Sequence, residues 1–132
     1  MKKTKRGLSD SNLQMHWRRC VRAIFGNRCF FCGASDELEV HHIVKRKTLL
    51  LRHDYRNGIL VCKYGCHHHA ETPVGKHKID AYLTSKGYLE YLQLRTGNCK
   101  DYFVQHGITR DDFLQSMLDE LRKVTENVGL GE

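Results

Sequence analysis

The sequence predicts an α+β fold in which two short strands and a helix form a small metal-stabilised module that is surrounded by helices. Two cysteine pairs each lie beside a short aliphatic run that is typical of a strand. Apolar residues recur at helical spacing before the first pair and again after the second. With 132 residues, the chain is long enough for one ordinary domain and too short for two.

The positive charge of the chain is concentrated in its first half. Lys and Arg number 22 against 15 Asp and Glu, which gives a net charge of +7. Up to Cys66 there are 14 basic and 5 acidic residues, a net charge of +9, and the remainder has 8 basic and 10 acidic residues, a net charge of −2. A basic half favours a polyanionic partner, most simply nucleic acid. The alternative is a solvated basic surface without a partner.

Neither a membrane protein nor a secreted protein is expected. No apolar run approaches the ~20 residues of a membrane-spanning helix. The basic residues at the N-terminus are not followed by the apolar segment of a secretory signal. We therefore expect a cytoplasmic protein, and in that reducing compartment clustered cysteines bind metal more often than they form disulfides.

We expect a single domain over residues 9–132, preceded by a basic, disordered arm over residues 1–8. The domain divides into a helix over 9–26, the metal module over 27–75 and a helical tail over 76–132. No internal repeat or low-complexity segment interrupts this order.

The first helix is predicted to begin near Ser9, a favoured N-cap residue, and to end at Gly26. Its apolar residues lie on one buried stripe, which comprises Leu13, Trp17, Cys20, Val21, Ile24 and Phe25. Arg18, Arg19 and Arg22 lie off that stripe.

Within the module, β-branched and aliphatic runs predict strands over residues 38–44 and 59–61, separated by a basic loop or broken helix over 45–55. A helical turn should follow at His67. It should extend no further than Thr72, because a proline disfavours helix in the residue before it.

The tail is predicted to be helical and to pack around the module. Apolar periodicity indicates helices over 78–86 and 88–95, interrupted at Gly87. The last helix begins at Thr109, with Asp112 three residues on in an arrangement like a capping box.

Four cysteines have the spacing of a structural zinc site. Cys29 and Cys32 are separated by two residues, and Cys62 and Cys66 by three. Each pair can reach one tetrahedral Zn²⁺ from a tight turn, and zinc would supply folding free energy to a module with little core of its own. Disulfides or unpaired thiols are the alternatives. Cys20 is interpreted as a buried thiol.

Histidines flank these cysteines. His41 and His42 end the first predicted strand, and His67, His68 and His69 follow Cys66 directly. If the four cysteines share one zinc, His41 and His67 are expected to converge on a second metal ion, with His42 on the neighbouring face. The alternative is that the histidines are ordinary surface or core residues, and His68 and His69 are expected to be exposed.

These elements, in this order, resemble the signature of the HNH endonucleases, whose fold is the ββα-metal or His-Me finger, in its zinc-binding variant. The resemblance rests on Cys29-x2-Cys32, on Leu-Glu-Val-His-His-Ile over residues 38–43, on Asn57-x2-Leu60-x-Cys62 and on Cys66-His67. More broadly, the chain is similar to phage recombination nucleases of the NinG/Rap type. That similarity lies in Leu-Arg-His-Asp-Tyr-Arg-Asn over residues 51–57 and in the charged helical tail.

The resemblance implies a role for each matching residue. His42 corresponds to the general base, and His41 and His67 to ligands of a catalytic divalent metal, usually Mg²⁺ with Mn²⁺ as an alternative. Asn57 corresponds to the middle residue of the motif, which orients the base or touches the metal. Where many members have a second terminal histidine, this chain has Glu71, a candidate third ligand. Pro73 shortens the turn that would bring Glu71 to the metal.

The function predicted from these residues is metal-dependent hydrolysis of DNA phosphodiester bonds, with low sequence specificity or with selectivity for branched or nicked DNA, in phage recombination or DNA processing. A neutral imidazole can deprotonate water near neutral pH, and a cation can stabilise the charge that develops on phosphate. Five basic residues in the loop before the second strand are predicted to contact DNA phosphates: Lys45, Arg46, Lys47, Arg52 and Arg56. The alternatives are a non-catalytic zinc module that binds nucleic acid, and an interaction protein that binds through its acidic C-terminal helix.

Overall fold

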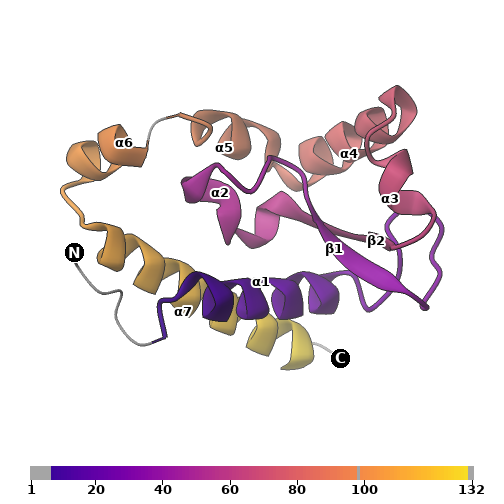
Figure 1. Ribbon diagram of the computed structural model, residues 1–132, viewed down its shortest axis with the longest axis horizontal. Coiled ribbons are helices and arrows are strands. Elements are labelled where there is room, and N and C mark those ends of the chain that lie inside the picture. Colours follow the sequence, from indigo (N-terminus) through magenta and orange to yellow (C-terminus); the bar gives the residue numbers. More distant parts are fainter. Residues whose placement is uncertain (1–6, 98, 131–132) are drawn as a thin grey trace.

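The computed structural model describes residues 7–97 and 99–130, and its mixed α+β architecture is the one the sequence predicts. In chain order the elements are α1 (Asp10–Ile24), β1 (Leu38–His42), α2 (Leu49–Arg52), the 3₁₀-helix η1 (Tyr55–Asn57), β2 (Gly58–Cys62), α3 (Cys66–His69), α4 (Pro73–Lys86), α5 (Leu89–Leu94), α6 (Cys99–His106) and α7 (Arg110–Leu130). The two strands lie at the centre, α1 and α7 pack side by side along one flank, and α4 and α5 lie on the other (Figure 1). No helix in the described part of the chain has the length and apolar character to span a membrane.

The two strands form an antiparallel hairpin with a long connection. Leu38 pairs with Cys62, and His42 pairs with Gly58. β1 ends at His42, two residues earlier than predicted, because the chain then turns away while the Ile43 N–H still donates to the Asn57 carbonyl at 3.1 Å. The connection contains α2 and η1, so the predicted loop or broken helix is a broken helix.

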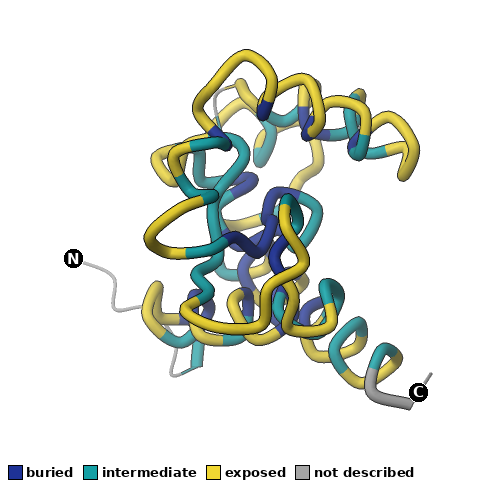
Figure 2. The backbone as a smooth tube through the Cα atoms, turned by 90° about the vertical axis from the view of Figure 1, so that its right-hand side faces the viewer, coloured by how far each residue is buried: buried dark blue, intermediate teal, exposed yellow. Residues whose placement is uncertain are grey.

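β2 is buried at the centre of the molecule, whereas β1 is half-buried (Figure 2). On one side Ile59 and Val61 pack with Ile79 and Leu83 of α4. On the other, α1 lies against the start of β2. A Cβ at Gly58 would meet the Val21 side chain at 2.7 Å, so only glycine permits this approach. Trp17 of α1 is fully buried in the same layer.

The ends of α1 and α7 follow the capping signals of the sequence. The Ser9 side chain accepts the Asn12 N–H, as expected for an N-cap. At α7, the Thr109 N–H donates to the Asp112 carboxylate and the Asp112 N–H donates to the Thr109 hydroxyl, which confirms the capping box.

The structure corrects three sequence expectations. Leu8, assigned to the disordered arm, is buried against the core cluster that includes α7, and Gly7 is half-buried. Residues 1–6 of that arm lie outside the described residues. α4 begins at Pro73 rather than near residue 78, because Thr72 caps it and proline is tolerated in the first helical turn. The expected boundary between module and tail at residue 75 therefore falls inside α4. α6 was not predicted, since it buries no residue fully and carries no strong apolar stripe.

Candidate active site

The four predicted zinc ligands come together at one end of the hairpin. Cys29 and Cys32 lie on the turn before β1, Cys62 is the last residue of β2, and Cys66 is the first of α3. Their sulfur atoms all lie within 4.8 Å of one another, and those of Cys32 and Cys62 are 3.3 Å apart. Tetrahedral zinc with bonds of about 2.3 Å would place its sulfur ligands about 3.8 Å apart. The cluster therefore fits zinc with only small movements, and the three-residue spacing of the second pair does not prevent it.

The electrostatics of the cluster also favour a cation. The Cys29 sulfur accepts the backbone N–H groups of Phe31 and Cys32 at 3.4 and 3.5 Å. Although burial alone would raise its pKa, these N–H groups lower the pKa of Cys29 to about 6. Contact with Cys32 raises the pKa of Cys62 to about 11, and burial and contact with Cys29 raise the pKa of Cys66 to about 12. The four thiols cannot all ionise beside one another without a metal. All six cysteines of the chain are free in the structure, so the disulfide alternative is wrong.

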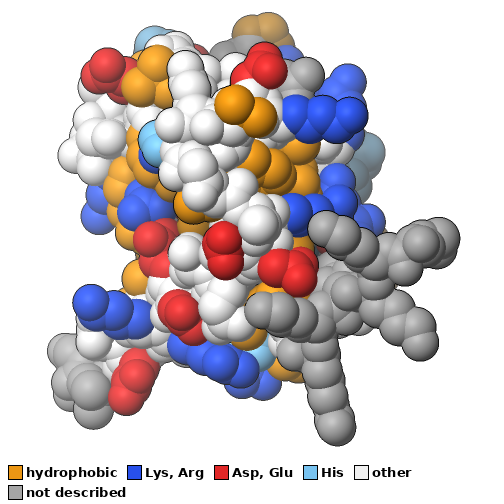
Figure 3. Space-filling view, turned by 90° about the vertical axis from the view of Figure 1, so that its left-hand side faces the viewer, with side chains coloured by type: hydrophobic (Ala, Val, Ile, Leu, Met, Phe, Trp, Pro, Cys, Tyr) orange, Lys and Arg blue, Asp and Glu red, His pale blue; other side chains and the backbone are white. Residues whose placement is uncertain are grey.

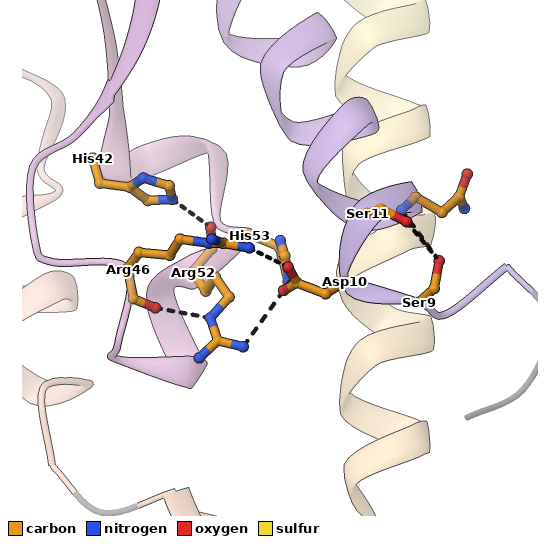
Figure 4. A network of polar contacts seen from close by, with 8 residues as sticks. Ser9, Asp10, Ser11, His42, Arg46, Arg52 and His53 are labelled. Atoms are coloured by element: carbon orange, nitrogen blue, oxygen red, sulfur yellow. Dashed lines mark hydrogen bonds and ion pairs between the residues drawn. The ribbon is translucent and has the colours of Figure 1, made fainter. Parts of the chain in front are cut away.

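His42 is held in one orientation at the end of β1. Its ring stacks on the indole of Trp17, with centroids 4.0 Å apart and planes 12° apart. Its Nε2 atom lies 2.9 Å from the carbonyl oxygen of Arg52 (Figure 4). Because a carbonyl can only accept, Nε2 carries the proton of the neutral ring and Nδ1 keeps the lone pair. Burial lowers the pKa of His42 below 6.5, so the neutral form that a general base requires predominates at neutral pH.

Asn57 is fully buried and acts on the loop rather than on the imidazole. Its Oδ1 accepts the Val44 N–H at 2.6 Å, and its Nδ2 donates to the carbonyl oxygens of Val44 and Leu51, both at 3.0 Å. These bonds occupy both polar atoms of the amide and fix both ends of the segment that leads to Arg52. Among the described residues, no hydrogen bond joins the Asn57 side chain to His42. The Asn57 side chain therefore holds the loop that carries the Arg52 carbonyl.

The predicted ligands of the second metal are only partly assembled. His41 Nε2 lies 3.6 Å from the Glu71 carboxylate, because the chain continues as a turn after α3, with the Glu71 N–H donating to the His68 carbonyl. The Nδ1 atom of His67 is instead 2.7 Å from the Lys63 carbonyl and 3.7 Å from the Glu39 carboxylate. Among residues 7–97 and 99–130, the four cysteines are the only group of three or more such ligands close enough to share one ion.

A groove of about 530 Å³ lies along β1 beside these histidines. His41, His42 and Glu71 line it, as do cationic residues from both walls. Its remaining polar residues are Glu39, Lys45 and Arg46 on one side and Lys76 and Asp80 of α4 on the other. A groove of this kind can receive a phosphate between an imidazole base and a pair of metal ligands. Lys76 and Asp80 were not predicted, because only the position of α4 brings them to β1.

The five predicted phosphate ligands occupy different environments. Lys45 and Arg46 line the groove and Lys47 is exposed beside it. Arg46 and Arg52 both pair with Asp10 at the start of α1, which His53 also contacts through Nε2 at 3.2 Å (Figure 4). These contacts fix the loop to α1.

Arg56 does not fit its predicted role as a phosphate ligand. Its guanidinium lies over the rings of Tyr55 and Tyr91, 4.4 Å from each centroid, and pairs with Asp54 at 3.1 Å and Glu120 at 2.9 Å. These partners come from η1, α5 and α7 and the Asp54 carboxylate is fully buried, so this arginine ties η1 to α5 and α7. The loop sequence alone contains no sign of these distant partners.

Two groups that hold the His42 imidazole in place were not predicted from the sequence. Trp17 was placed correctly on the buried stripe of α1, but its stacking on His42 depends on the packing of α1 against the hairpin. The Arg52 carbonyl is a backbone group, and no side-chain pattern identifies it.

Comparison with known protein families gives a match over the module. Residues 29–72 match the family model of the HNH endonucleases, over about a third of the chain. The matched segment contains both cysteine pairs, the hairpin, α2, α3 and Glu71. Neither the curated proteins nor the solved structures gave a match to the chain. The similarity to NinG/Rap-type phage nucleases has no support from these comparisons and stays a prediction.

Proposed function

We propose that this protein is a metal-dependent endonuclease that hydrolyses phosphodiester bonds of DNA. The observation that carries the proposal is the fixed imidazole of His42, neutral and with Nδ1 free, beside a groove that His41 and Glu71 line. The match of residues 29–72 to the HNH endonucleases supports the same chemistry.

In the proposed reaction, Nδ1 of His42 removes a proton from a water molecule that attacks the phosphorus in line with the departing 3′-oxygen. The Arg52 carbonyl keeps the tautomer that makes this possible, and Trp17 keeps the ring plane. When bound, a divalent cation would neutralise charge on the phosphate and on the leaving oxygen. The departing 3′-oxygen takes a proton from solvent, so the products would carry 5′-phosphate and 3′-hydroxyl ends.

His41 and Glu71 are the residues that fit such a cation, with His67 as a further candidate ligand. An imidazole nitrogen and a carboxylate oxygen suit Mg²⁺ or Mn²⁺ when waters and phosphate oxygens complete the coordination. The four cysteines would hold zinc in a structural role, because thiolates select zinc over magnesium and their cluster leaves no position open.

Weak sequence specificity is part of the proposal. Lys45 and Lys47 are exposed cations, and Arg46 lines the groove although it also pairs with Asp10. These side chains would contact phosphates, which carry no base information. The same surface would accept branched or nicked DNA. We therefore also propose that the protein acts in phage recombination or DNA processing.

A nicking assay tests the proposal directly. Supercoiled plasmid and a four-way junction are incubated with the wild type or with His42→Ala, in Mg²⁺, in Mn²⁺ or without added divalent cation. Metal-dependent cleavage that disappears in His42→Ala, with 5′-phosphate ends shown by end-labelling, is expected. DNA binding without cleavage of either substrate would instead favour a non-catalytic zinc module, and 3′-phosphate ends would rule out the proposed reaction.

A further inference from the structure

α1 carries a basic surface that lies outside the segment matched to the HNH endonucleases. Arg18 and Arg19 are exposed and Arg22 is half-buried, all on the side of the helix that faces away from the core. Together with Met15, Ala23 and Asn27 they line a shallow depression of about 460 Å³. We call this set of six residues the α1 basic surface.

The positive charges of the α1 basic surface are not neutralised within the fold. Arg46 and Arg52 pair with Asp10, and Arg56 pairs with Asp54 and Glu120. In the described part of the chain, by contrast, Arg18 and Arg19 have no carboxylate partner. Figure 3 views the molecule from the left-hand side of Figure 1, and on that face acidic and basic side chains are intermixed. Neighbouring cations without counter-charges repel one another, and a polyanion lying across them would relieve that repulsion.

Two contacts align the α1 basic surface with β1. At one end, the Arg22 guanidinium donates to the carbonyl of Leu38, the first residue of β1, at 3.3 Å. At the other end, Trp17 stacks on His42, the last residue of β1. Arg18 follows Trp17 directly in the sequence and is exposed. The arginines therefore run beside the strand that ends at the general base.

We infer that the α1 basic surface is a second DNA-binding surface, on which Arg18 and Arg19 bind phosphates of the strand that flanks the scissile phosphate at His42. The inference rests on the proposed endonuclease function. Arginine suits this task because its planar guanidinium makes paired hydrogen bonds to phosphate oxygens. The rise along α1 from Arg18 to Arg22 is about 6 Å, so the α1 basic surface can extend past more than one phosphate of a strand.

The test compares two double variants that lose the same charge. Arg18→Gln with Arg19→Gln removes two cations from the α1 basic surface. Lys78→Gln with Lys86→Gln removes two exposed cations from α4 that line neither the groove nor the α1 basic surface. Both pairs are combined with His42→Ala so that binding is measured without cleavage. The dissociation constant for a fluorescein-labelled DNA duplex is then measured by anisotropy across a series of salt concentrations.

The arginine variant is expected to bind DNA about tenfold more weakly at ~0.1 M salt. The slope of the logarithm of the binding constant against the logarithm of the salt concentration should fall in magnitude by about 0.9 for each phosphate that the protein no longer neutralises. The lysine variant should stay within about twofold of its parent. Arg18→Lys with Arg19→Lys, which keeps the charge, should recover most of the affinity. Equal losses of affinity in the arginine and lysine variants, at unchanged thermal unfolding midpoints, would overturn the inference.

Cleavage assays on the same variants with His42 restored separate this inference from the proposed function. The arginine variant should raise KM for DNA and change kcat little, because its residues bind flanking phosphates and not the reacting one. A wild type that binds DNA through α1 and never cleaves it would contradict the endonuclease and leave the binding surface standing. If the wild type cleaves DNA and the arginine variant keeps full affinity, the endonuclease proposal stands and the proposed α1 binding surface is wrong.

Discussion

The Nε2 atom of His42 lies 2.9 Å from the carbonyl oxygen of Arg52, ten residues further along the chain. This single contact decides which ring nitrogen can act as a base, because the carbonyl accepts only from a protonated nitrogen. The loop that delivers the carbonyl is fixed by the Asn57 amide on one side and by the pairs of Arg46 and Arg52 with Asp10 on the other. The orientation of the base therefore depends on residues from α1, from the loop and from η1.

Loss of the imidazole should remove catalysis and leave the fold intact. His42→Ala is expected to lower kcat by about 100-fold or more, the usual contribution of a positioned general base. DNA affinity should stay within about threefold, since His42 makes no charge contact at neutral pH. His68→Ala, an exposed histidine outside the groove, is the matched control and should cleave like the wild type. Full activity in His42→Ala would mean that another group activates the water.

Zinc and stability should be lost together when the cysteine cluster is broken. Cys32→Ser is expected to reduce bound zinc from about one equivalent towards none and to lower the thermal unfolding midpoint by roughly 10 °C or more. Elemental analysis of the purified protein and thermal unfolding followed by circular dichroism measure the two effects. Cys99→Ser, which changes a cysteine outside the cluster, should keep its zinc. Cys32→Ser with its stability unchanged would contradict a structural role.

Arg56 should prove to be a structural residue and not a DNA ligand. Arg56→Gln leaves the fully buried Asp54 carboxylate without its cationic partner, which is expected to cost roughly 3 kcal/mol of unfolding free energy. The salt dependence of DNA binding should not change, because the guanidinium is enclosed by Tyr55 and Tyr91. Urea unfolding and anisotropy test the two halves of this prediction. Lys47→Gln should give the reverse pattern, with weaker DNA binding and unchanged stability.

His53 should make the protein sensitive to acid. Burial lowers the pKa of this histidine from 6.5 to about 4, although Asp10 opposes the change. The unfolded state therefore binds a proton more readily, and stability that is complete above pH 6.5 is lost as the pH falls towards 4. The loss over this window should amount to roughly 3 kcal/mol.

Urea unfolding of the wild type and of His53→Gln between about pH 7 and about pH 5 measures the first part of this loss. The amide of glutamine can still donate to Asp10 but cannot titrate, so the variant should show a flatter profile. His77→Gln, at an exposed position, should keep the wild-type slope. Identical slopes in all three proteins would show that His53 is not the titrating group.

Local signals in the sequence were sufficient for most elements. The Ser9 N-cap, the capping box of Thr109 and Asp112, and the break at Gly87 each act within a few residues, and each lies where it was predicted. α6 was missed because its residues make few buried contacts and no strong periodicity marks it. The start of α4 was missed because Pro73 was interpreted as the end of one helix and is also the first residue of the next.

The sequence by itself determined the cysteine cluster, the hairpin and the candidate histidines, because the spacing of ligands along a short chain restricts how a metal module can fold. Only the tertiary structure decided how those residues are used. It placed the Arg52 carbonyl and the Trp17 ring against His42, enclosed Arg56 and left Arg18 and Arg19 exposed beside β1. Such contacts join residues from 10 to 64 positions apart, and they are set by how α1, α5 and α7 pack around the hairpin. No local pattern encodes that packing.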